Sequence, residues 1–215
     1  MVSSFYIDEA AALRNVFKVI AACDHVTSVR LYLEFYDEQA YASLAAYVRG
    51  ASSLKEIDLA IEIAYLDGEE DAVKGYDERQ RSLSNLCKAL SSNVEISTIN
   101  FTSTIEIGND DCQELADAAL NNRHLHELSV NCMSESYVPV FLDRLLSRLA
   151  QCYNLLLLRV QTCDARDKLR DVQDILRRNC SLVERATRFV MGEHVPYCAH
   201  AFQVVSEEPA LVFNV

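Results

Sequence analysis

The sequence predicts an α/β solenoid in which short strands form an inner parallel sheet and helices cover its outer side. Two observations predict this fold: a strand pattern that recurs five times, and helical stripes that keep register with it. The pattern apolar-x-x-apolar-x-apolar begins at positions 26, 54, 96, 125 and 155, so successive starts are separated by 28, 42, 29 and 30 residues. Such a period indicates stacked units, because a single unit cannot bury its own core.

An amphipathic helix precedes each strand pattern. Apolar residues lie 13, 10 and 6 positions before each start, which is the i, i+3, i+7 spacing of one helical face. The stripes are Leu13/Val16/Ile20, Tyr41/Leu44/Val48, Leu83/Leu86/Leu90, Cys112/Leu115/Ala119 and Leu142/Leu145/Leu149. Asp37 and Asp110 stand just ahead of two of these helices as candidate N-caps, and Pro139 suits a first helical turn.

The same registers predict how the chain is divided. Residues 1–25 hold the first helix, with no strand before it, because the register would place that strand ahead of Met1. Residues 26–180 hold the repeats. An inserted loop over 60–81 accounts for the long second spacing, and it is either a solvated surface loop or a partner-binding loop at the rim.

The repeat pattern fails near the C-terminus. Arg185 occupies the position of a strand apolar residue, so residues 181–215 are predicted to form a helical cap. Its helices are expected over 181–191 and 197–205, covering the open edge of the last strand.

Repeats of 28 to 30 residues with this strand motif and a full helix resemble leucine-rich repeats of the ribonuclease-inhibitor type, as in NACHT-domain immune receptors and F-box proteins. The resemblance covers about residues 9–182, and the whole chain is similar to short arthropod members of this class. The Asn or Cys that this family places three residues after the last strand apolar residue is mostly absent. The corresponding residues are Glu34, Glu62, Thr104, Met133 and Cys163, and Cys163 alone matches. The turns that leave the strands are therefore expected to be irregular.

Composition limits the classes of partner. The chain has 20 Lys+Arg against 32 Asp+Glu, a net charge of −12, which disfavours nucleic acid and favours basic partners. No apolar stretch is long enough to cross a membrane. The eight cysteines are scattered through apolar segments, so free, buried thiols in a cytoplasmic protein are predicted.

Candidate catalytic and metal-binding groups are weak. The sequence lacks the phosphate-binding, nucleophile-elbow and zinc-protease motifs, so no enzyme, no cofactor and no metal site is predicted. His124 and His126 are expected at a solvated strand entry. The group His194, Cys198 and His200 has ligand types at plausible spacing, and it alone supports the alternative of a metal-dependent enzyme.

The predicted strands offer the best candidate binding surface. If the apolar residues point into the solenoid, the alternating residues point to its concave side. The predicted partner-binding residues are Arg30, Tyr32, Glu56, Asp58, Asn100, Glu127, Asn131, Leu157 and Arg159. Arg and Tyr are frequent binding anchors, and here they lie at the two ends of the arc with acids between them. The alternative is a polar surface with no particular ligand.

The predicted function is a non-catalytic protein- or peptide-binding module whose partner carries a basic patch. The family resemblance implies a role in intracellular immune sensing or, as the alternative, in substrate recognition by an F-box-type ubiquitin ligase. Residues 161–190 carry seven basic and five acidic side chains, which would either steer an anionic partner or form a mixed solvated helix face. The sequence does not determine the oligomeric state.

Overall fold

The computed structural model describes residues 2–6, 10–33, 37–62, 71–162, 164–207 and 209–212. Strands and helices alternate until the sixth strand, and only helices follow it. The strands are β1 (Val2–Tyr6), β2 (Ser28–Leu33), β3 (Glu56–Ile61), β4 (Thr98–Ile107), β5 (Glu127–Met133) and β6 (Leu157–Val160). The helices are α1 (Ala10–Ala21), α2 (Glu38–Gly50), α3 (Asp71–Ser92), α4 (Asn109–Asn121), α5 (Val138–Leu149), α6 (Arg166–Val190), α7 (Pro196–Ser206) and α8 (Pro209–Val212).

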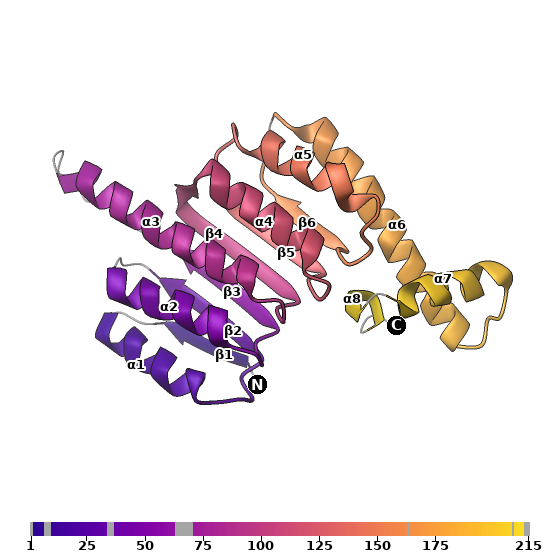
Figure 1. Cartoon of the computed structure of the whole chain (residues 1–215), viewed down its shortest axis with the longest axis horizontal. Helices are drawn as coiled ribbons and strands as arrows, with labels where there is room; N and C mark the ends of the chain where they lie inside the picture. Colours follow the sequence, from indigo (N-terminus) through magenta and orange to yellow (C-terminus); the bar gives the residue numbers. More distant parts are fainter. Residues whose placement is uncertain are drawn as a thin grey trace.

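The six strands form one parallel sheet in chain order. Their register follows the sequence repeat, so equivalent residues of successive units lie beside one another. One such row is Val29, Ile57, Ile99, Leu128 and Leu158. Helices α1 to α5 and the first half of α6 form a second layer on one side of the sheet (Figure 1). The predicted α/β fold, with a parallel sheet and outer helices, is confirmed.

The core lies between these two layers. Alternate strand residues such as Leu31, Leu59 and Phe101 are almost fully buried. The central residues of four helical stripes, Leu44, Leu86, Leu115 and Leu145, are buried as well, whereas Val16 of the first stripe is half-buried. One continuous apolar cluster runs from α1 to α6. Burying each large side chain stabilises the fold by about 2 kcal/mol, so stacking supplies what a single unit lacks.

Buried asparagines fix the turns that lead from α2, α3, α4 and α5 into the strands that follow them. The Nδ2 of Asn93 donates to the carbonyls of Val48 and Ala51 at 2.6 and 3.0 Å. One repeat later, the Nδ2 of Asn122 donates to the carbonyls of Asn93 and Ile96 at 3.3 and 3.0 Å. Each amide therefore satisfies buried carbonyls of the preceding turn, which would otherwise cost about 1–3 kcal/mol each.

Asn154 and Asn179 continue this asparagine ladder. The Nδ2 of Asn154 reaches three carbonyls, those of Ala119, Asn122 and Leu125, at 2.7 to 3.3 Å. Asn179 lies inside α6 and donates to the carbonyls of Cys152 and Leu155. The ladder stands where the chain enters the strands, whereas the expected family asparagine stands where the chain leaves them.

At the N-terminus, the structure differs from the sequence-based expectation. A strand does precede the first helix: β1 pairs with β2 so that Val2 lies beside Ser28, a spacing of 26 residues. The expectation that no strand fits there is wrong, because the first unit is shorter than the 28 residues assumed from the second.

Two further segments are helical beyond the predicted bounds. The helix α3 begins at Asp71, so half of the expected inserted loop 60–81 is helix, and residues 63–70 lie outside the described residues. The Glu, Arg and Gln side chains over 78–81 favour this extension. At the C-terminus α6 runs unbroken through Ser181, where a separate helix was expected to begin. The helix expected over 197–205 corresponds to α7.

Candidate functional site

The side chains of β2 to β6 that point away from the helices form a polar surface, here called the strand face. Parallel register arranges them in rows that cross the strands. The first row is Ser28, Glu56, Thr98, Glu127 and Leu157, the second is Arg30, Asp58, Asn100, Ser129 and Arg159, and the third is Tyr32, Ala60, Thr102 and Asn131. All nine predicted partner-binding residues belong to these rows, so the structure brings them onto one surface.

Two ion pairs cross neighbouring strands on this face. The Nε of Arg30 lies 2.8 Å from Oδ2 of Asp58, and Nη1 of Arg159 lies 3.3 Å from Oε1 of Glu127. Both arginine side chains remain more than half exposed, at 66% and 61%. Exposed pairs of this kind contribute little to stability, so the face does not depend on them for folding.

The remaining predicted residues differ in their exposure. Glu56 and Asn131 are exposed, whereas Tyr32, Asn100 and Leu157 are half-buried. The hydroxyl of Tyr32 donates to Oε2 of Glu62 at 2.6 Å, which holds the ring at the C-terminal end of β2.

These pairs change the predicted charge of the face. Arg30 and Arg159 do lie toward its two ends, but each is neutralised by the acid on the next strand inward. Glu56 is the acid of the first two rows that no described cation balances. An incoming cation would therefore meet Glu56 directly and would have to compete with an arginine for Asp58 or Glu127.

Sequence reasoning missed Glu62 as part of this surface. The family resemblance identifies Glu62 only as a substitute for the turn residue, whereas its spacing of 30 residues from Tyr32 places it one strand further along. In a parallel repeat, a spacing of about one repeat identifies residues that meet across neighbouring strands. The 28-residue spacing of Arg30 and Asp58 is another example.

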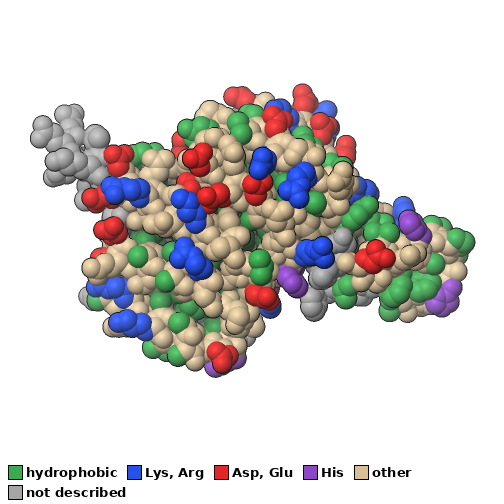
Figure 2. Space-filling view, viewed as in Figure 1, with side chains coloured by type: hydrophobic (Ala, Val, Ile, Leu, Met, Phe, Trp, Pro, Cys, Tyr) green, Lys and Arg blue, Asp and Glu red, His purple; other side chains and the backbone are tan. Residues whose placement is uncertain are grey.

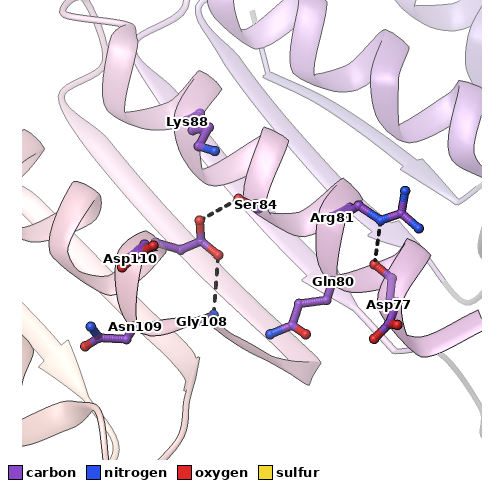
Figure 3. Close-up of a pocket in the computed structure, with 9 residues that line it drawn as sticks. Asp77, Gln80, Arg81, Ser84, Lys88, Gly108, Asn109 and Asp110 are labelled. Carbon is purple, nitrogen blue, oxygen red and sulfur yellow. Dashed lines mark hydrogen bonds between the residues drawn. The ribbon is translucent and has the colours of Figure 1, made fainter. Parts of the chain in front are cut away.

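A depression of about 530 Å³ lies between α3 and the start of α4. Figure 3 shows Gln80 of α3 extending toward Asn109 of α4, whereas the Arg81 guanidinium points away from Asp110 and donates to the Asp77 carbonyl. The buried carboxylate beneath is Asp111, which accepts hydrogen bonds from the Ser84 hydroxyl at 2.7 Å and from the Gly108 amide at 3.3 Å.

The N-cap of α4 is therefore Gly108 rather than Asp110, which the sequence suggested, and Asp111 in the first turn accepts the Gly108 amide. The other predicted cap is confirmed, since Asp37 accepts the Ala40 amide at 2.7 Å. With both charge signs around its wall, the depression has no clear preference for a ligand.

The described residues provide little reactive chemistry. Cys87, Cys112 and Cys132 are buried as predicted, and burial raises the pKa of all three thiols, that of Cys112 to about 12. A thiol with a raised pKa is a poor nucleophile because the thiolate is the reactive form.

Neither histidine group forms a metal centre within the described part of the chain. No three His, Cys, Asp or Glu side chains there converge well enough to hold an ion. The His194 ring packs edge-on against Phe189, with centroids 4.8 Å apart, while Cys198 is buried. Among the described helices, none is both long and apolar enough to cross a bilayer.

Comparison with solved structures shows where this architecture occurs. The chain is similar to a structure of leiomodin-1 actin-binding site 2, with 14% identity and a TM-score of 0.55, covering 85% of this chain and 92% of that one. It is also similar to the tropomodulin C-terminal domain of Caenorhabditis elegans, with 12% identity and a TM-score of 0.53, covering 86% and 99%. At this identity the likeness establishes a shared fold.

No protein-family model matches the sequence, and no curated protein matches it. The predicted membership in the ribonuclease-inhibitor class, with NACHT, F-box and short arthropod relatives, is wrong: the similar structures are leiomodin and tropomodulin domains. The strand motif reports the stacking of parallel units and is not specific to that class, whose characteristic turn residue is missing at four of the five positions.

Proposed function

We propose that this chain is a non-catalytic protein-binding module, a leucine-rich-repeat-like horseshoe whose strand face is the concave binding surface. The observation that carries the proposal is the alignment of polar and charged residues, several of them exposed, in rows across β2 to β6. A sheet face left open by the helix layer offers a broad, rigid surface, and such surfaces suit proteins better than small molecules.

The charge of the strand face indicates the chemistry of the partner. Glu56 lacks a described counter-ion, and Asp58 lies on the same strand two residues away. We propose that the partner presents a Lys or Arg to these two carboxylates. The cation would take the exposed side of Asp58 while Arg30 keeps the other, because a carboxylate can accept several hydrogen bonds at once.

Actin is the first partner to test, since the leiomodin-1 structure that shares this fold is described as an actin-binding site. This proposal replaces immune sensing and substrate recognition by a ubiquitin ligase, which depended on the family resemblance that the comparisons overturn. A cytoplasmic location follows if actin is the partner.

The test is co-sedimentation of the purified chain with actin filaments, together with binding to actin monomers. The double variant Glu56→Arg with Asp58→Arg reverses the charge of β3, and we expect it to weaken binding at least about tenfold, the effect of losing one charge-assisted contact.

The matched control is Asp167→Arg with Asp171→Arg, which reverses two exposed acids on α6 in the helix layer. This control should bind like the unmodified chain. Absence of binding to either form of actin would rule out actin as the partner. Unchanged binding by the β3 variant would show that the strand face is not the site.

A further inference from the structure

The edge of the sheet where the strands begin carries a basic surface that the strand face does not include. Three successive segments meet there, 118–126, 144–161 and 175–183, and none of them contains an Asp or Glu. The asparagine ladder stacks them, since Asn154 and Asn179 each bond to the carbonyls of the preceding turn. In a chain with a net charge of −12, an acid-free region of this size is unexpected.

A depression of about 280 Å³ opens between the first two of these turns, where α4 and α5 end. Its polar lining consists of guanidinium, amide and phenol groups, with no carboxylate. The lining residues are Leu120, Asn121, Arg123, Arg148, Gln151, Cys152, Tyr153 and Asn154. We call this the arginine pocket.

Neither arginine of the pocket forms an ion pair with a described acid, although the charge of Arg148 helps to lower the pKa of Asp117. Arg148 donates to Oδ1 of Asn121 at 3.3 Å, and Arg123 makes no hydrogen bond or ion pair with any described residue. The nearest acid of α4, Asp117, is held by Arg144 through two hydrogen bonds of 2.7 and 2.8 Å. Two cations therefore face solvent beside an acid that is already neutralised.

Arg178 adds positive charge behind the pocket wall. Its guanidinium carbon lies 4.6 Å from the centroid of the Tyr153 ring, and it donates to the carbonyls of Ala150 and Cys152. These bonds join the end of α5 to α6, so the Arg178 guanidinium is already occupied by protein groups. It fixes the aromatic wall against which a ligand would lie.

Arg123 and Arg148 are not needed to cap the carbonyls at the ends of the helices. Asn154 already satisfies the carbonyls of Ala119, Asn122 and Leu125. The helix dipole favours Arg148 in the last turn of α5 by a few tenths of a kcal/mol, but Arg123 lies beyond the end of α4. Two exposed guanidiniums around a cavity are what carboxylate or phosphate recognition requires, because each can donate two parallel hydrogen bonds.

We propose that the arginine pocket binds an acidic peptide segment of a partner protein, with a carboxylate or a phosphorylated side chain between Arg123 and Arg148. A cavity of this volume admits one or two side chains. A nucleic acid is disfavoured because the acidic remainder of the chain would repel its phosphate backbone. This site is independent of the strand face, which favours cations.

The experiment uses the full chain and three fluorescent hexapeptides: one rich in Glu, one with a central phosphoserine, and one rich in Lys. We expect anisotropy to show binding of the two acidic peptides at low salt, weakening as salt screens the charges. Arg123→Ala with Arg148→Ala should weaken binding at least about tenfold, since hydrogen bonds to charged groups are lost. The stronger of the two acidic peptides tells carboxylate from phosphate recognition.

The matched control is Arg49→Ala. Arg49 occupies the last turn of α2, as Arg148 does in α5, but lies outside the pocket, so its loss should leave peptide binding unchanged. Three results would overturn the proposal: no binding of either acidic peptide, equal weakening by Arg49→Ala, or tighter binding of a single-stranded oligonucleotide than of both peptides. Because the strand-face variant of β3 should bind these peptides normally, failure here is distinguishable from failure of the proposed function.

Discussion

The repeats and the C-terminal helices show two different ways of ending a helix at the same register. Asn122 closes α4, and a strand follows whose apolar residues are Leu125, Leu128 and Val130. Asn179 stands at the equivalent position and makes the same kind of bond, yet α6 continues past it to Val190. The asparagine therefore permits the turn but does not cause it. The burial pattern that follows decides between strand and helix.

The two regions also differ in how their cores are built. The repeats share one apolar cluster, which extends from α1 to α6 between the sheet and the helix layer. The residues after Ser181, here called the C-terminal unit, rest on a second cluster of three buried residues, Ala186, Val205 and Leu211, and the half-buried Tyr153 and Leu156 of the last repeat pack against it. Hydrophobic side chains gather on the outside of this unit (Figure 2). The exposed ones are Val190, Met191, Tyr197, Phe202 and Val212.

Because their cores differ, the repeats and the C-terminal unit need not unfold together. The buried apolar residues described in this unit are Ala186, Cys198, Ala201, Val205 and Leu211. A core of this size supplies a small part of the hydrophobic free energy, and weakly supported segments open before the global transition. Electrostatics is local in the C-terminal unit as well, since Arg188 pairs with Glu193 only five residues away.

The largest expected effect comes from truncating one leucine in each core. Leu128→Ala in β5 should lower the free energy of unfolding by about 3–4 kcal/mol, because the surrounding strands cannot close the cavity. Leu211→Ala in α8 should cost about half as much in global stability. Urea denaturation followed by circular dichroism measures both, and equal losses would show that the two cores form one cooperative unit.

Thiol labelling compares the opening of the repeats with that of the C-terminal unit without a substitution in either core. Cys112 and Cys198 are both fully buried, the first in the repeats and the second in the C-terminal unit. As urea is raised, Cys198 should react with a maleimide at a lower concentration than Cys112, because its surroundings open first. Simultaneous reaction, read by mass spectrometry, would contradict separate opening. The exposed Cys180 serves as the reference for full reactivity.

A smaller effect is expected from the asparagine ladder. Asn122→Ala should destabilise the chain by about 3 kcal/mol, since two buried carbonyls lose their donor and the His124 amide loses its acceptor. Asn179→Ala should cost about 1–2 kcal/mol, because Arg178 still donates to the Cys152 carbonyl and α6 has its own backbone bonds. Thermal unfolding of both variants tests this order, and a larger loss for Asn179→Ala would reverse it.

The smallest effect concerns pH. The hydrogen bonds from Arg144 hold the pKa of Asp117 below its ordinary value, and those from Arg188 do the same for Glu193. A lowered folded-state pKa stabilises the fold above the unfolded pKa of about 4, and this stability is lost as pH falls through the folded value. Asp117→Asn should therefore cost about 0.5 kcal/mol at pH 7 and progressively less below pH 4.

Glu193→Gln provides the comparison in the C-terminal unit. Its pair is exposed and local, so hydrogen exchange in α7 should respond while the global transition stays in place. A shift of the global transition with Glu193→Gln as large as that with Asp117→Asn would show that the C-terminal unit is coupled to the repeats.

Much of the strand face could be predicted from the sequence, because in a parallel repeat the number of residues between two positions tells whether they lie side by side on neighbouring strands. Arg30 and Asp58 lie 28 residues apart and meet across β2 and β3. What counting could not give is which charges are already paired, since that depends on side-chain reach: Glu127 meets Arg159, whereas Glu56 meets no described cation. The arginine pocket was hidden for a related reason, because Arg123 and Arg148 belong to different repeats at positions outside the strand and helix stripes.

The sequence also misjudged the ends of the chain and its relatives. A repeat two residues short concealed β1, and a run of helix-forming residues extended α3 into the expected loop. The family assignment failed because a strand-and-helix period is a requirement of stacking, which several families meet with unrelated residues.

A strand pattern in register with a helical stripe was enough to determine the layers, the sheet order and the side of each strand that is buried. These follow from the two-residue and 3.6-residue periods of strands and helices, which the apolar residues record directly. Tertiary structure alone decided the rest: the asparagines that hold each turn, the ion pairs across the strand face, and the arginines left without acids. Those depend on contacts between residues about one repeat apart, whose distances no local pattern contains.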